Sequence, residues 1–287
     1  MPQSRVTIIG NVGDDTKFYG LHISPDLDIV AYSLAGMVDP VKGWGFKGDT
    51  FHCQKTLQRY GYQTWFNLGD RDLATHLYRT EQLLHGKKLS TVTSEIVSSL
   101  GLDVRLLPSS DGMLQTYVSS GSRRMHFQEY MVRFRTKPRV NGVFFKGAGS
   151  AKPAPNVIQS IIGADGIIIS PSNPIVSIGA ILVVRGIRSA LGKTRARIVG
   201  ISPIVGGKTV KGPADKLMKA LGIECSAVGV AALYRDFLDA LIIDQADWKL
   251  APRIRSLGIK PVVTQTLMKT MTDKVRLARI AVSEVKS

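Results

Sequence analysis

Three short acidic motifs contain the residue types that bind a hard cation. The motifs are Gly13-Asp14-Asp15, Asp26-Leu27-Asp28 and Asp70-Arg71-Asp72. Magnesium takes oxygen ligands and usually joins one or two carboxylates to the phosphates of a substrate. Helix capping is the alternative, because Asp26 and Asp70 each begin a helical pattern and an N-cap contributes roughly 0.5–2 kcal/mol. Capping does not explain the second carboxylates, Asp28 and Asp72, so the pattern favours a cation, with complementarity to the helix dipole as its rival.

Three loops that follow predicted strands are rich in small and hydroxyl-bearing residues, at positions 10–15, 170–174 and 202–207. Ligands of doubly wound sheets bind outside the carboxyl ends of the strands, where backbone amides of small residues can approach an anion. One such loop is most often only a turn. Three at corresponding strand ends favour a shared nucleotide or diphosphate crevice. His76 follows Asp72 by four positions on the same helix face, which makes it a candidate substrate contact, with a core or surface histidine as the alternative.

The elements that must position these residues alternate between short apolar runs and amphipathic stretches, which predicts an α/β fold. Strands are expected at residues 6–12, 104–107, 166–170, 197–202, 241–244 and 260–264, and helices at 26–37, 49–60, 70–84 and 91–100. Residues 115–147 alternate like antiparallel strands. We therefore expect a single domain over 1–287, with a doubly wound, mostly parallel, Rossmann-like sheet, a helical insertion at about 20–102 and a small antiparallel addition.

Composition narrows the class of protein. The chain has 287 residues, and 38 Lys and Arg against 22 Asp and Glu give a net charge of +16. This excess indicates an anionic partner but does not separate nucleic acid from a small phosphorylated molecule. The two cysteines, Cys53 and Cys225, are too far apart for a CxxC metal site and too few for a disulfide scaffold. No apolar run approaches the roughly 18 residues of a membrane span, so we expect a cytoplasmic protein.

Taken together, the motifs resemble those of one family over nearly the whole chain. Besides the acidic motifs, the matching segments are residues 24–28, 43–45, 68–76, 125–129, 170–174 and 202–207, in this order. They are similar to the 2-phospho-L-lactate transferase family of coenzyme F(420) biosynthesis. The resemblance implies a magnesium-dependent transfer of a phospholactyl, or in bacterial relatives a phosphoenolpyruvyl, group from a guanosine diphosphate-linked donor to the deazaflavin Fo. It also implies a homodimer.

The resemblance implies roles for particular residues. Asp14 and Asp28 would lie where magnesium meets Fo, and Ser170, Ser172 and Asn173 would face the guanosine nucleotide. Asp28 could instead bind or deprotonate an Fo hydroxyl; positioning is preferred, because a carboxylate bound to a metal is a poor base. Arg71 or Lys211 could stabilise charge on the transferred phosphate. The other expected substrate contacts are Asn11, Gly13, Ser24, Asp26, Asn67, Asp70, Asp72, His76 and Ser202.

Two departures from the family pattern bear on these expectations. Family members begin with a strand and a glycine-rich phosphate-binding loop ahead of the strand that matches Val6–Val12, and this chain has neither. We therefore hypothesise that the chain as written is truncated, and that restoring the upstream residues would change its stability and activity. Asn67 stands where many relatives carry Lys or Arg near Fo. This difference puts in doubt the contact between residue 67 and Fo, but it does not put the reaction in doubt.

Two other classes compete with the transferase. One is a non-catalytic nucleotide-sugar-binding protein of the related gluconeogenesis-factor family, which shares the fold; residues 69–76 and 126–129 favour the transferase instead. The other is a basic nucleic-acid-binding module, suggested by the charge and by Arg133-Phe134-Arg135. No recognised nucleic-acid motif or stacking platform supports that reading, so small-molecule substrates are the expected partners.

Overall fold

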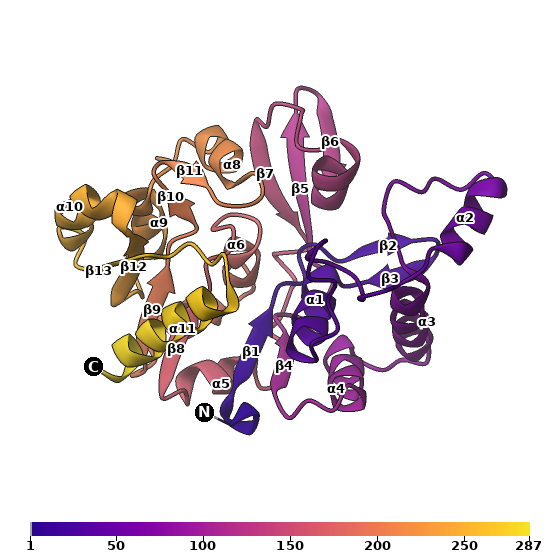
Figure 1. Ribbon diagram of the computed structural model, residues 1–287, viewed down its shortest axis with the longest axis horizontal. Coiled ribbons are helices and arrows are strands. Elements are labelled where there is room, and N and C mark those ends of the chain that lie inside the picture. Colours follow the sequence, from indigo (N-terminus) through magenta and orange to yellow (C-terminus); the bar gives the residue numbers. More distant parts are fainter. Residues whose placement is uncertain (1) are drawn as a thin grey trace. The chain divides into compact units, whose positions relative to one another are not determined.

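The computed structural model describes residues 2–287, which form two compact units. We call them the N-terminal and the C-terminal unit. The N-terminal unit runs to Tyr117 and also includes Met125–Lys137 and Phe145–Val157, and the C-terminal unit contains the rest. Figure 1 shows both, coloured along the chain.

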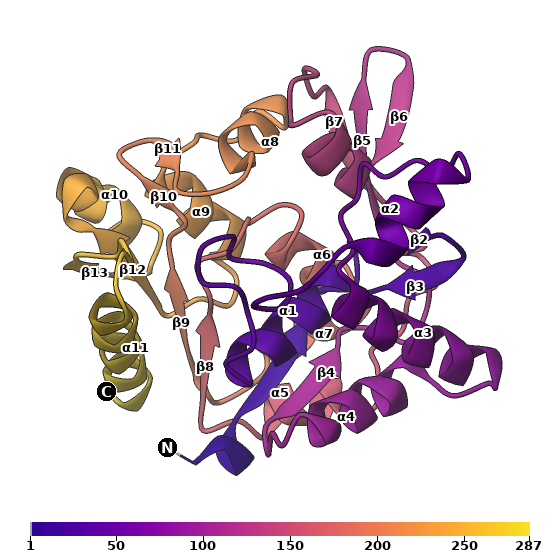
Figure 2. The ribbon, with the colours of Figure 1, turned by 45° about the vertical axis from the view of Figure 1, so that its right-hand side comes forward.

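The N-terminal unit is built on two parallel strands. Strand β1 (Thr7–Gly10) pairs with β4 (Arg105–Pro108), with Thr7 opposite Arg105 and Gly10 opposite Pro108. Between them in sequence come the antiparallel pair β2 (Thr16–Phe18) and β3 (Leu21–Ile23) and four helices, α1 (Pro25–Leu34), α2 (His52–Arg59), α3 (Asp70–Leu84) and α4 (Leu89–Ser99). Helices α3 and α4 lie side by side (Figures 1 and 2), and α4 packs on β4.

The C-terminal unit contains a four-stranded parallel sheet in the order β13-β12-β9-β8. Its strands are β8 (Gly166–Ile169), β9 (Arg197–Ile201), β12 (Ala240–Asp244) and β13 (Lys260–Thr264). Strand β12 is buried along its whole length, as a central parallel strand covered on both faces should be. Its Ala240 and Ile242 pack with Val199 and Ile201 against Leu277 and Ala281 of α11 (Met271–Lys286).

The remaining elements complete both units. Helices α5 (Val157–Ile162), α6 (Ile178–Leu182), α7 (Ile187–Leu191), α8 (Ala214–Ala220), α9 (Ala227–Tyr234) and α10 (Ala251–Arg255) connect the parallel strands, with a 3-10 turn at Gln245–Leu250. Strands β10 (Ile204–Val205) and β11 (Lys208–Thr209) form an antiparallel hairpin. A three-stranded sheet has the order β6-β5-β7, with β5 (Gln115–Ser120), β6 (Arg123–His126) and β7 (Gly142–Lys146). A 3-10 turn at Gln3–Arg5 precedes β1, and a π-helical turn at Glu129–Arg133 lies between β6 and β7.

The α/β fold class with mostly parallel strands and small antiparallel additions is confirmed. All six predicted strands are present within two residues of their expected bounds, but they pair as two parallel sheets, one in each unit. The predicted insertion at 20–102 contains all four expected helices. It also contains strand β3 of the β2–β3 pair, whereas β2 precedes it. The sequence did not predict this pair because each strand has only three residues, too few to show an alternating pattern. The two strands are joined at Tyr19 and Gly20, both of which have positive φ. The single domain over 1–287 stays a prediction.

Candidate functional site

The loop after β1 is fixed by one amide side chain. Gly10 ends the strand, and a Cβ there would meet Leu27 Cδ2 at 2.4 Å, so glycine lets α1 approach β1 closely. The buried Asn11 accepts a hydrogen bond from the Gly13 amide at 2.7 Å and donates one to Asp26 Oδ2 at 2.7 Å. Asn11 therefore joins the turn of this loop to the first turn of α1.

Asp14 is buried with one carboxylate oxygen unpaired. Its Oδ2 accepts a hydrogen bond from Gln128 Nε2 at 3.2 Å, whereas Oδ1 has no hydrogen-bond partner within residues 2–287. Burial raises the pKa of Asp14 well above its ordinary value, and the nearby charges of Asp26 and Asp15 raise it further. Burial likewise raises the pKa of Asp26 to about 6. A buried, unpaired carboxylate oxygen next to a second acid is an arrangement that a cation would stabilise.

The protein oxygen atoms available at Asp14 suit a magnesium ion whose other ligands are water and substrate oxygens. Across residues 2–287, no three His, Cys, Asp or Glu side chains converge on one point as a ready-made metal site. Magnesium typically keeps several waters and uses one or two carboxylates with substrate phosphates, so Asp14 with its free oxygen fits this donor set. The predicted pairing of Asp14 with Asp28 at one ion is not tested by these contacts.

Asp28 is held by an arginine from another helix. Both carboxylate oxygens of Asp28 accept hydrogen bonds from the Arg79 guanidinium of α3, with Nη1 at 3.0 Å from Oδ2 and Nη2 on Oδ1. Both side chains are buried, and Arg79 is only 1% exposed. His76 Nδ1 lies 3.2 Å from Arg79 Nη1, and because a guanidinium only donates, this ring nitrogen is the acceptor.

The network continues from His76 to the first turn of its own helix. His76 Nε2 lies 3.4 Å from Asp72 Oδ1, which accepts a hydrogen bond from Tyr32 of α1 at 3.0 Å. Asp72, His76 and Arg79 occur at i, i+4 and i+7 and therefore share one face of α3. Desolvation and the charges of Asp28 and Asp72 raise the pKa of the Tyr32 hydroxyl, so Tyr32 stays protonated and donates.

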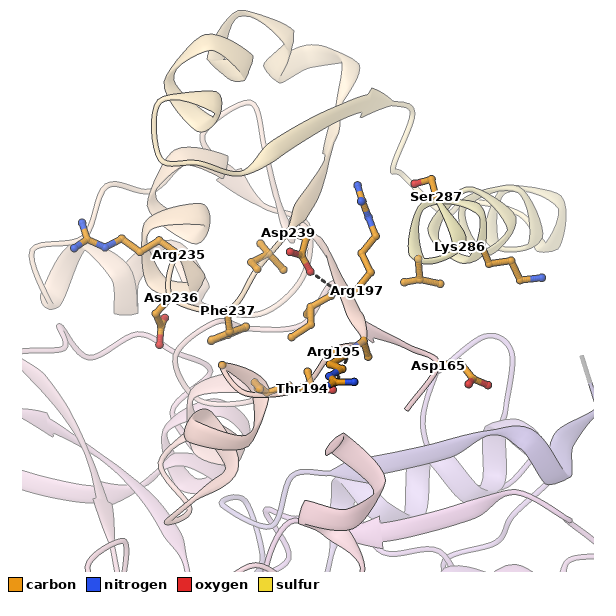
Figure 3. Close-up of a pocket in the computed structure, with 16 residues that line it drawn as sticks. Asp165, Thr194, Arg195, Arg197, Arg235, Asp236, Phe237, Asp239, Lys286 and Ser287 are labelled. Atoms are coloured by element: carbon orange, nitrogen blue, oxygen red, sulfur yellow. Dashed lines mark hydrogen bonds between the residues drawn. The ribbon is translucent and has the colours of Figure 1, made fainter. Parts of the chain in front are cut away.

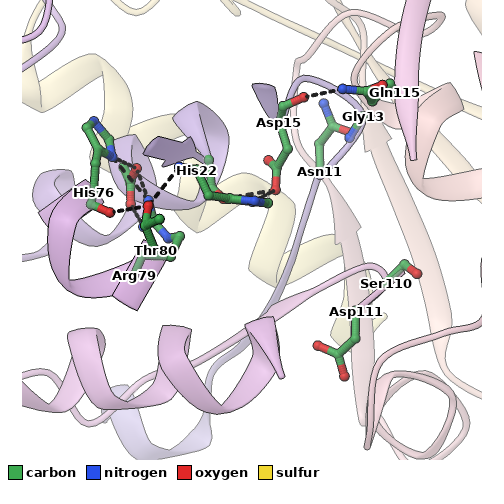
Figure 4. A network of polar contacts seen from close by, with 12 residues as sticks. Asn11, Gly13, Asp15, His22, His76, Arg79, Thr80, Ser110, Asp111 and Gln115 are labelled. Carbon is green, nitrogen blue, oxygen red and sulfur yellow. Dashed lines mark hydrogen bonds and ion pairs between the residues drawn. The ribbon is translucent and has the colours of Figure 1, made fainter. Parts of the chain in front are cut away.

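A second polar chain lies beside the first (Figure 4). Asp15 Oδ2 accepts hydrogen bonds from Ser24 Oγ at 2.8 Å and from His22 Nε2 at 3.0 Å. The His22 amide donates to Thr80 Oγ1, which donates to the carbonyl of His76. Ser24 is fully buried, so this predicted substrate contact uses its hydroxyl inside the protein to orient Asp15.

Asp70 does not cap its own helix, contrary to the sequence interpretation. Its carboxylate accepts hydrogen bonds from the His52 and Cys53 amides and so caps α2, while Asp49 accepts from the Arg71 and Asp72 amides and caps α3. We call this exchange the crossed caps. It explains why α2 begins at His52 and not at Asp49, where the sequence placed it.

Asp26 was also expected to begin its helix, but α1 begins one residue earlier, at Pro25, whose fixed φ suits the first helical position. Helix α4 begins at Leu89, before the expected Thr91. Neither helix receives a side-chain hydrogen bond from the residue preceding it. Asn67 and Arg71 are exposed near the start of α3, and the Arg71 guanidinium lies 4.9 Å from the centre of the Phe46 ring.

In the C-terminal unit, the predicted nucleotide contacts follow two neighbouring strands. Ser170, Ser172 and Asn173 come after β8, and Ser202 comes after β9; the register sets Ile169 opposite Gly200, so both loops leave the same edge of the sheet. Asn173 Oδ1 accepts hydrogen bonds from the Ile175 and Val176 amides, which leaves its Nδ2 outside these turn contacts.

The loop after β9 uses its polar groups internally. The buried Ser202 hydroxyl donates to the Ile204 carbonyl and accepts from the Ile204 amide. The Gly206 amide, expected to approach an anion, donates instead to the Asp247 carboxylate at 3.0 Å. Lys211 is exposed in the segment between β11 and α8. Ser170 is exposed and Ser172 and Asn173 are half-buried, so the loop after β8 presents more polar groups than the loop after β9.

A hollow of about 630 Å³ in the C-terminal unit lies away from these loops. Figure 3 shows that Asp165, Arg195, Arg197 and Asp239 line it. These residues precede or begin β8, β9 and β12, whereas Ser170 and Ser202 follow their strands. The hollow therefore lies at the amino edge of the parallel sheet, opposite the edge where doubly wound folds bind ligands, and we assign it no part in the predicted chemistry.

Six residues of the N-terminal network were not among the predicted site residues: Asp15, His22, Tyr32, Arg79, Thr80 and Gln128. For Arg79 the sequence held a signal, because it lies on the helix face that carries Asp72 and His76. Asp15 directly follows Asp14, a predicted metal ligand, in the sequence. Nothing local indicates His22, and Gln128 reaches Asp14 across 114 positions.

The sequence matches a known family model over residues 2–280. Its description is 2-phospho-L-lactate transferase CofD. The chain belongs to this family. It is 42% identical to a phosphoenolpyruvate transferase of Kitasatospora aureofaciens, over 98% of this chain and 90% of that protein. The phosphoenolpyruvate transferase of Streptomyces coelicolor is 41% identical with the same coverage.

Membership of the CofD family makes the chain a transferase. A crystal structure of a Bacillus halodurans protein of the UPF0052 family has the same fold, with a TM-score of 0.61 and 16% identity over 96% of this chain and 90% of that one. At this identity the likeness concerns the fold alone. Within residues 2–287, every helix is too short or too polar to cross a membrane.

Proposed function

We propose that this CofD-family chain transfers a phospholactyl or phosphoenolpyruvyl group from a guanosine diphosphate-linked donor to the deazaflavin Fo. The products would be GMP and coenzyme F(420)-0 or its dehydro form, made in a magnesium-dependent reaction of coenzyme F(420) biosynthesis. The observation that carries the proposal is the unpaired buried oxygen of Asp14, next to Asp26, in the loop after β1. Its relatives' name, phosphoenolpyruvate transferase, favours the phosphoenolpyruvyl donor.

The reaction exchanges one phosphorus–oxygen bond for another. The oxygen of an Fo hydroxyl bonds to the phosphorus that carries the lactyl or enolpyruvyl group, the bond from that phosphorus to the GMP oxygen breaks, GMP leaves with the bonding electron pair, and the hydroxyl proton passes to water. Such transfers depend mainly on positioning the two oxygens in line and on neutralising the diphosphate charge. Bound magnesium would supply that neutralisation as a Lewis acid.

The roles of the residues follow from their surroundings. Asp14, with a free oxygen, would hold magnesium. Arg79 already balances the charge of Asp28, so Asp28 is better suited to accept a hydrogen bond from the acceptor hydroxyl than to bind a second cation. Asn173 Nδ2 and the hydroxyls of Ser170 and Ser172 would bind the nucleotide, because they lie at the carboxyl edge of the C-terminal sheet. Arg71 or Lys211, both exposed, would contact the transferred phosphate.

The direct test is incubation of the protein with Fo, magnesium and each donor separately, followed by mass spectrometry. We expect equimolar GMP and a deazaflavin phosphodiester, with faster turnover of the phosphoenolpyruvyl donor. No product with either donor would overturn the proposal. The proposal includes a homodimer and a cytoplasmic location, and sedimentation of the purified protein tests the first.

A further inference from the structure

The pair formed by Asp28 and Arg79 is the most deeply buried charged contact of the N-terminal unit that the sequence did not predict. The two residues are 51 positions apart, on α1 and α3, and both guanidinium Nη atoms bond the carboxylate. A fork of this kind fixes the plane of a carboxylate as well as its position, which a lysine ammonium does not do.

Stability alone is a weak explanation for this pair. Burying an ion pair costs desolvation energy, and well-packed apolar residues in its place are often neutral or stabilising. Arg79 also keeps its Nε without a hydrogen-bond partner in the described part of the chain, a further cost in a buried group. A contact with these costs is better explained if the orientation of Asp28 serves the reaction.

The surroundings of the pair show what it orients. Asp28 follows Asp26 by two positions in the first turn of α1, and Asn11 binds Asp26 from the loop that carries Asp14. Arg79 also donates a hydrogen bond to His76. His76 in turn lies next to Asp72, which accepts a hydrogen bond from Tyr32. The guanidinium is thus held by α3, and the carboxylate that it orients lies in the same helical turn as Asp26, which Asn11 joins to the acidic loop.

We propose that Arg79 is a positioning residue that acts through Asp28: it compensates the charge of Asp28 and fixes its carboxylate plane, so that Asp28 accepts a hydrogen bond from the acceptor hydroxyl. This inference rests on the proposed transfer reaction. It divides the acids of the loop and α1 into two kinds: Asp28 is balanced by a protein cation, and Asp14 is left for a metal cation.

The test compares Arg79→Lys, Asp28→Asn and the double variant. Arg79→Lys keeps the charge and loses the fork, so kcat should fall about 10- to 100-fold, as for other residues that orient a ligand-binding group. The KM of the donor and the affinity for Mn²⁺, measured by calorimetry, should stay within about twofold. In the Asp28→Asn background, Arg79→Lys should cause little further loss, because its effect passes through Asp28.

A matched control is Arg188→Lys, since Arg188 makes a similar two-bond contact with Asp236 on the exposed surface of the C-terminal unit. This variant should leave kcat unchanged. Circular dichroism gives the folded fraction of each variant. A kcat per folded molecule within twofold of wild type for Arg79→Lys, or a loss additive with Asp28→Asn, would overturn the role of Arg79. Absence of product from the wild-type protein would instead overturn the proposed function, while the Mn²⁺ measurement would remain interpretable.

Discussion

The loop after β1 and the loop after β8 both follow a parallel strand, yet their polar groups are organised differently. In the N-terminal loop, Asp14 and Asp15 are buried. Asp14 accepts a hydrogen bond from Gln128, 114 positions away, and Asp15 accepts one from Ser24, which lies beyond the β2–β3 pair. In the C-terminal loop, Asn173 bonds amides two and three residues away. The first site depends on tertiary packing, and the second is a local turn. Substitutions should therefore affect both rate and stability in the first, and mainly substrate binding in the second.

The largest expected effect is that of Asp14→Asn. The amide keeps the shape of the side chain but loses the charge that would bind magnesium, so kcat should fall by about 10³-fold or more, the scale of losing a key electrostatic contact. Calorimetry with Mn²⁺ should show weakened binding. Asp103→Asn, an exposed acid of the same unit, is the control and should have no effect. Wild-type Mn²⁺ affinity in Asp14→Asn would show that Asp14 is not a metal ligand.

Asn173→Asp should have the next largest effect. Its carboxylate can still accept from the Ile175 and Val176 amides and so keep the turn, but it replaces the Nδ2 donor with a negative charge facing an anionic donor. We expect the KM of the guanylyl donor to rise by about 10- to 100-fold, which corresponds to losing roughly 1.5–3 kcal/mol of a charged hydrogen bond. The melting temperature should not change. Ser189→Ala on the surface is the control, and an unchanged KM would remove Asn173 from the nucleotide site.

Because of the crossed caps, substitution of Gly69 should destabilise the N-terminal unit. A Cβ on Gly69 would stand 2.0 Å from Asp49 Oδ2, so Gly69→Ala must displace the carboxylate that caps α3. We expect a loss of roughly 1–3 kcal/mol in the free energy of unfolding, as for other overpacked sites. Gly149→Ala has open space around the new methyl group and negative φ, and it should change stability very little. Equal denaturation midpoints for the two variants would contradict the crossed caps.

The acids of the β1 loop should give the metal-free protein an unusual pH dependence. Because burial raises the pKa of Asp26 to about 6, the folded state holds this proton more strongly than the unfolded state does. Stability should then fall as the pH rises from about 4 to 6, by up to about 3 kcal/mol at 1.36 kcal/mol per pKa unit. The raised pKa of Asp14 should continue this fall at higher pH.

The measurement is the melting temperature between pH 4 and 8, with and without magnesium. Asp26→Asn should flatten the profile and melt higher than wild type at pH 8, and magnesium should stabilise the wild type more at pH 8 than at pH 5. A wild-type melting temperature that rises steadily over this range would show that these carboxylates are ionised at little cost.

What the sequence could predict follows the same division between local and distant contacts. Strands such as β13 and the helix α3 were placed to the residue, because apolar periodicity is a local property. Type and spacing picked out the acidic motifs that contain Asp14, Asp26 and Asp28, and the family resemblance then selected Asp14 and Asp28 among them. The hydrogen bonds of Asp28 with Arg79 and of Asp14 with Gln128 join residues 51 and 114 positions apart, and no local pattern specifies such partners.

The helix starts failed for the same physical reason. A carboxylate at the start of a helical pattern normally caps its own helix, but Asp49 and Asp70 each cap the other's, through contacts that depend on how α2 and α3 pack. The turn at Asn173, by contrast, is set by an asparagine and the two amides that follow it within three residues, and its location after β8 was predicted from sequence.

The most direct test of the account is GMP release by the wild-type chain, measured with magnesium and the phosphoenolpyruvyl donor, in the presence and absence of Fo. We predict that GMP appears only when Fo is present, in amounts equal to the new deazaflavin phosphodiester, and that Asp14→Asn abolishes both products. GMP released at the same rate without Fo would identify a hydrolase, and equal transfer by Asp14→Asn would contradict the assignment of the acidic loop after β1 as the reaction centre.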